Sequence, residues 1–150
     1  MPYDPQAPSE CERSYMYYFL YVGLAVSAIL AIGTLTGLPS VVAAFCFIVA
    51  GLLAPVFLLA NRFDDYFTAM VRTGCVWAMA VVAAWAAIVG LLNIGSMANI
   101  AGEMAVVGYD PASPYAFGIP AFMNEASTLA IFALLAFHQG AVFHHVIGTK

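Results

Sequence analysis

The three histidines of this chain, His138, His144 and His145, stand close together near its C-terminal end. Imidazole binds metal ions and titrates near neutral pH, so a cluster of histidines is a place to look for chemistry. His138 and His145 are seven residues apart, which places them on one face of a helix and about 10 Å apart along its axis. Two rings at that separation cannot ligate one metal ion from opposite sides.

No arrangement typical of an enzyme accompanies these histidines. The sequence has no HExxH zinc motif, no phosphate-binding loop and no dinucleotide-binding glycine pattern. Cys11, Cys46 and Cys75 are widely spaced and form no CxxC pair, so they predict no metal site. We therefore expect that the chain is not an enzyme by itself, although it fits a subunit of an oxidoreductase complex.

The composition places most of the chain in a membrane. Hydrophobic residues make up 64% of the chain and charged residues only 8%, whereas soluble domains carry roughly a quarter charged residues. The formal charge is −4 and no run of Lys or Arg is present, which argues against nucleic acid as a partner. Because each membrane span uses about 20 residues, we expect a single membrane domain over residues 1–150.

Apolar runs that are long enough to cross the hydrocarbon layer as helices occur at about residues 15–38, 40–60, 73–93 and 127–147. We therefore predict an all-α integral membrane protein, an up-down bundle of four transmembrane helices. Its bases fall on one side of the membrane, and the positive-inside rule predicts that both termini are cytoplasmic (N-in/C-in). These bases are Arg13, Arg62, Arg72 and Lys150.

The connection between the second and third spans has helical periodicity, with an apolar face that includes Phe63, Tyr66 and Phe67 and a polar face that includes Asp64 and Asp65. This pattern predicts a short amphipathic helix at the membrane surface, or a helical extension of a neighbouring span. We take these five residues as a candidate interface with a partner.

The extramembrane segment 94–126, between the third and fourth spans, begins with helical spacing and continues with three prolines. It is too apolar for a disordered loop. We expect a short interfacial helix here and contact with the membrane surface or another subunit, with Glu103, Asp110 and Glu125 facing water.

His138 lies eleven residues into the last run, at a depth where an ionisable side chain is a functional-site hypothesis. It is the first candidate cofactor ligand, and His145 is the second. Haem b would need its other axial ligand from a methionine or a second chain, whereas chlorophyll or bacteriochlorophyll needs one axial ligand. The alternative is a neutral His138 that donates a hydrogen bond within a packed helix interface.

Small residues recur at four-residue spacing, as in Gly23 and Ser27 of the first run and Ala80 and Ala84 of the third. Such faces allow helices to approach closely inside a membrane. They exceed what one four-helix bundle needs, so we include Gly23 and Ser27 among the candidate interface residues.

These patterns favour a non-catalytic accessory subunit of a larger energy-transducing membrane complex, of respiratory or photosynthetic electron transport, which supplies scaffold and lipid or quinone contacts. Its expected partners are other integral membrane subunits and bound lipids. Two alternatives remain open: a haem- or (bacterio)chlorophyll-binding anchor that uses His138, and a small homo-oligomeric transporter. The alanine-rich, lysine-poor composition favours a bacterial inner membrane, with the mitochondrial inner membrane as the alternative.

Overall fold

The computed structural model describes residues 9–37, 39–59, 65–106 and 120–148. Their helices are α1 (Glu10–Thr36), α2 (Ser40–Leu59), α3 (Asp65–Val106), the short 3-10 helix η1 (Ala121–Asn124) and α4 (Ala126–Gly148). All four α-helices are long and apolar enough to cross a membrane. The predicted all-α fold with four candidate spans is confirmed.

Local sequence signals set the ends of α1. Ser9 caps its first turn through a reciprocal pair of contacts with Glu12: the Ser9 N–H donates to Glu12 Oε2 (2.8 Å) and the Glu12 N–H donates to Ser9 Oγ (3.3 Å). Gly37 ends the helix with a φ of 81°, which a glycine adopts without a steric penalty. Its N–H donates to the carbonyl of Gly33, and α2 begins only three residues later, so α1 and α2 form a hairpin.

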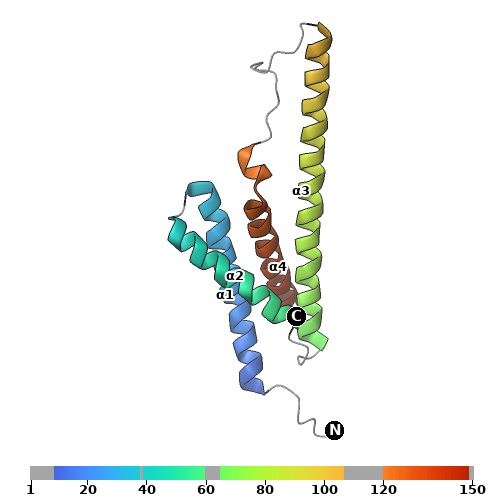
Figure 1. Cartoon of the computed structure of the whole chain (residues 1–150). Coiled ribbons are helices and arrows are strands. Elements are labelled where there is room, and N and C mark those ends of the chain that lie inside the picture. Colours follow the sequence, from blue (N-terminus) through green and yellow to red (C-terminus); the bar gives the residue numbers. More distant parts are fainter. Residues whose placement is uncertain (1–8, 38, 60–64, 107–119, 149–150) are drawn as a thin grey trace.

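Successive helices run in opposite directions. In Figure 1, α1 and α3 begin towards the lower part of the view, and α2 and α4 end there. The most central helix is α4, which packs most extensively against α3 and α1 and to a smaller extent against α2. Accordingly, 44% of the most apolar part of α4 is buried, whereas none of the corresponding part of α3 is.

The core has two parts that differ in which helices contribute. The lower cluster draws on all four helices, with residues such as Leu20, Phe57, Phe67 and Phe137. The upper cluster draws only on α1, α2 and α4, with Leu30, Cys46, Ala50 and Ile131 among its members. Only the first turns of α3, with Phe67, Met70 and Val71, therefore contribute buried residues to the core.

The most apparent difference from the sequence-based expectation is that α3 is one continuous helix. Residues 65–72 form its first turns, which is the second of the two alternatives that the sequence left open, rather than a separate surface helix. Residues 94–106, expected as a separate interfacial helix, continue the same helix at its other end. The reason is that no proline interrupts residues 65–106, and isolated glycines weaken a helix without ending it.

Three acidic residues of the segment between the third and fourth spans were expected to face water. Glu125, directly before α4, is exposed as expected. Asp110 and the side chain of Glu103 lie outside the described residues. Of the remaining connection, the structure describes η1, a single turn that leads into α4.

Candidate functional site

His138 is fully buried on the side of α4 that faces α1. Its Nδ1 lies 2.8 Å from the backbone carbonyl oxygen of Leu134 and 3.1 Å from Oγ of Ser27 on α1. A carbonyl oxygen only accepts, so Nδ1 carries the proton and donates to Leu134, with the Ser27 hydroxyl oxygen as a second, longer acceptor. This arrangement is that of a hydrogen-bonded histidine in a packed helix interface.

The other edge of the imidazole ring, which contains Cδ2 and Nε2, lies against Gly23 of α1, at the position where a Cβ atom would otherwise stand. Nε2 is buried and has no hydrogen-bond partner among the described residues. The rings of Phe57 and Phe137 approach His138 edge to face, with centroid distances of 6.2 and 5.2 Å. The imidazole is therefore enclosed on both edges.

This enclosure bears on the haem and chlorophyll alternatives. In the tautomer described above, Nε2 holds the lone pair that a metal would need. The Gly23 backbone covers that atom, so a macrocycle could bind there only if α1 and α4 moved apart. The packing of His138 therefore does not fit axial ligation of haem or chlorophyll, and we derive no chemistry through such a group.

His145 also faces α1 but belongs to a different environment, at the end of the bundle. Its ring stacks on Tyr17 with a centroid distance of 4.8 Å and an interplanar angle of 22°. The Tyr66 hydroxyl donates to the backbone carbonyl of His145 (3.2 Å). The neighbouring His144 places Nδ1 3.4 Å from Oγ1 of Thr73. Tyrosine and histidine side chains in such a cluster suit the boundary between hydrocarbon and headgroups.

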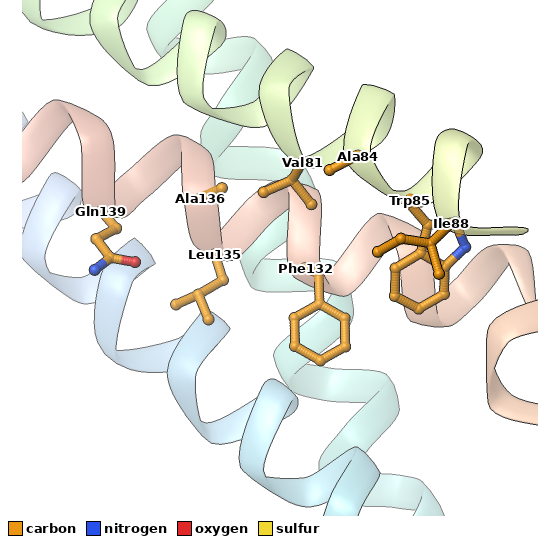
Figure 2. Close-up of a pocket in the computed structure, with 8 residues that line it drawn as sticks. All are labelled: Val81, Ala84, Trp85, Ile88, Phe132, Leu135, Ala136 and Gln139. Carbon is orange, nitrogen blue, oxygen red and sulfur yellow. The ribbon is translucent and has the colours of Figure 1, made fainter. Parts of the chain in front are cut away.

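An open pocket lies between α3 and α4, on the side of α4 that carries Gln139 (Figure 2). Its volume is about 320 Å³. The walls are apolar, with Val81, Trp85 and Ile88 from α3 and Phe132 and Leu135 from α4. Gln139 stands at one end of the pocket and Trp85 towards the other. This α3–α4 pocket is a candidate binding site formed by described residues of both helices.

The candidate interface residues from the sequence have different environments. Gly23, Ser27 and Phe67 are buried inside the chain, where they join its own helices rather than a partner. Tyr66 is half-buried and bonded to α4, whereas Asp65 is exposed. Phe63 and Asp64 lie outside the described residues.

Sequence reasoning did not find the pocket. Gln139 is a polar residue in the last apolar run, next to His138, and the sequence alone does not show which neighbour each of the two side chains faces. Adjacent helical residues point about 100° apart, which is why His138 faces α1 while Gln139 faces the pocket with α3. The feature of the sequence that could have indicated this pocket is the single amide side chain, Gln139, within the last apolar run.

No protein-family model matches this sequence, and comparison with curated proteins and with solved structures finds no significant similarity. The described residues contain no group of three or more histidine, cysteine or acidic side chains placed to hold a metal ion.

Proposed function

We propose that this chain is a non-catalytic accessory subunit of a larger integral membrane complex, of the energy-transducing kind that carries respiratory or photosynthetic electron transport. It supplies scaffold and contacts to lipid or quinone. The observation that supports this proposal is the exposure of α3, whose most apolar part contains no buried residue.

The alignment of α3 with α4 explains this exposure. Tyr66 contacts His145 near the end of α4, Trp77 lies against Gly140, and the Trp85 N–H donates to the carbonyl of Met123 before α4 begins. The α3 residues beyond Ile88 therefore extend past the start of α4. This projection holds 18 residues, 89–106, which corresponds to about 27 Å of helix.

The projecting part of α3 remains apolar. Leu91, Ile94 and Met97 are 69%, 66% and 72% exposed, and Gly90 and Gly95 have no atom of another element within 4 Å of a Cβ position. The whole helix is about 63 Å long, which exceeds the roughly 30 Å of the hydrocarbon layer. Apolar side chains beyond the bilayer are unfavourable in water, so we infer that another subunit covers them.

Within the bilayer, α3 presents a second surface suited to a neighbour. Ala80, Ala83 and Ala87 are exposed, and small residues such as Ala83 and Ala87, at four-residue spacing, allow a second helix to approach closely. The exposed part of α3 thus continues the projecting surface into the membrane.

The test is the native mass of the endogenous protein, extracted in mild detergent. We expect it to co-migrate with a complex many times the mass of the 15.9 kDa chain. Substitution Met97→Lys should release the chain from that complex, whereas Leu35→Lys, at a comparably exposed apolar position near the end of α1, should not. Migration of the endogenous chain as a monomer or small homo-oligomer would contradict the proposal.

The energy-transducing class has its own test. The isolated complex should show the visible absorption bands of haem, chlorophyll or flavin carried by its other subunits. A colourless complex without redox-active groups would contradict this part of the proposal and leave the accessory role in place.

A further inference from the structure

Gln139 is a polar side chain in an unfavourable position. It is exposed on α4 and lines the α3–α4 pocket, whose other walls are apolar. Its amide makes no hydrogen bond with the described residues, in contrast to Asn93 on α3, which donates to the carbonyl of Val89 (3.0 Å). An amide that faces hydrocarbon without a partner is costly, so the position of Gln139 indicates a ligand.

The depth of Gln139 narrows the chemistry of that ligand. Gln139 lies nine residues before the end of α4 and thirteen after its start, or about 14 Å and about 20 Å from the two ends. The ester carbonyls of membrane phospholipids lie near the headgroups and do not reach this depth. The partner of Gln139 is thus a neutral molecule that carries its polar group into the hydrocarbon layer, about 9 Å of helix beyond the boundary at which His145 lies.

The pocket walls indicate where the rest of the molecule lies. From Gln139 the pocket runs past Leu135 and Phe132 towards Trp85 (Figure 2). The indole of Trp85 is held by its hydrogen bond to Met123 and by the Phe132 ring, at a centroid distance of 5.9 Å. A volume of about 320 Å³ is at the lower end of small-molecule sites. It accommodates a ring with the first part of an apolar tail.

We propose that the α3–α4 pocket binds a neutral lipophilic carbonyl compound of the quinone class. The Gln139 amide N–H donates to a ring carbonyl oxygen, and the apolar tail lies along Leu135 and Phe132 towards Trp85. This inference deepens the quinone contact of the proposed function, but it concerns the chain alone. Native mass tests the assembly and ligand binding tests the pocket, so the two can fail separately.

The two tryptophans allow a direct test. The chain contains only Trp77 and Trp85, and Trp77 lies outside the pocket, against Phe143. In the variant Trp77→Phe, Trp85 is the remaining fluorophore. Purified protein in detergent micelles is titrated with a decyl-substituted benzoquinone, which quenches indole fluorescence on contact. We expect saturable quenching, whereas the variant Trp85→Phe should show only the linear, collisional component.

Substitution of Gln139 tests the hydrogen bond. Gln139→Leu in the Trp77→Phe protein should raise the midpoint of quenching about tenfold, the factor that corresponds to one lost hydrogen bond in an apolar site. The matched control Asn93→Leu removes an amide outside the pocket and should leave the midpoint unchanged. Circular dichroism of each variant verifies that the helices are retained.

Several results would overturn the proposal. These are quenching of Trp85 that does not saturate, an unchanged midpoint in Gln139→Leu, and equal competition by decylbenzene, which lacks the carbonyl. Displacement of the quinone by added phospholipid at equal mole fraction would assign the pocket to lipid chains. A stable dimer of the purified chain with no quenching would assign it to a second copy.

Discussion

The backbone of Gly23 on α1 lies in direct contact with the imidazole edge of His138 on α4. A side chain at position 23 would occupy the space of that ring, so the missing Cβ determines how closely the two helices approach. Ser27, one turn further along α1, then reaches Nδ1 of the same ring. The α1–α4 interface therefore depends on a small residue and a hydroxyl that face one histidine.

Addition of a single methyl group should loosen this interface. Gly23→Ala places a Cβ against Cδ2 and Nε2 of His138, and we expect a loss of about 1–3 kcal/mol of stability, typical of overpacking. The control Gly90→Ala meets no atom within 4 Å and should leave stability unchanged or slightly raised. Thermal unfolding in detergent, followed by circular dichroism, measures both. Equal midpoints for the two variants would contradict the close contact.

The hydrogen bond between Ser27 and His138 should show a small, measurable coupling. A double-mutant cycle with Ser27→Ala and His138→Phe should give an interaction energy of about 0.6 kcal/mol, the average for polar contacts between membrane helices. The cycle is measured by unfolding in mixed micelles. Strict additivity of the two substitutions would show that the hydroxyl and the imidazole do not interact.

Phe67 should matter because α3 enters the core only near its start. Its ring is 3% exposed and contacts Tyr17 and Phe57. Phe67→Ala should cost about 3–5 kcal/mol, because it leaves a cavity where all four helices meet. The same substitution at Phe45, which is 67% exposed, should cost much less. Similar losses at the two positions would contradict the assignment of the core.

The predicted N-in/C-in orientation is testable through cysteine labelling. Cys11 at the start of α1 is exposed, and the substitutions Cys46→Ala and Cys75→Ala leave it as the sole thiol. A membrane-impermeant maleimide should label Cys11 only after intact cells are permeabilised. In the same background, Cys11→Ser combined with Glu125→Cys, at the opposite end of the bundle, should be labelled without permeabilisation. The reverse pattern would place both termini outside.

Features that depend on neighbours along the chain could be predicted from the sequence. Four apolar runs of sufficient length predict four helices, because unpaired backbone groups are not tolerated in lipid. Ser9 and Glu12 are three residues apart, which is the spacing of a capping box, and this cap is present at the start of α1. A hydrogen bond from His138 within a helix interface, which the structure contains, was one of the alternatives that the sequence left open.

The sequence by itself determined which segments form helices, because helix formation depends on local hydrogen bonds and on the length of each apolar run. The tertiary structure decided which faces meet. Gly23 and Ser27 resemble other small residues until α4 places His138 against them. Gln139 gains its significance only because α3 and α4 leave a pocket beside it. Such contacts join residues that are far apart in the chain, and shape complementarity between helices, rather than periodicity within one helix, selects them.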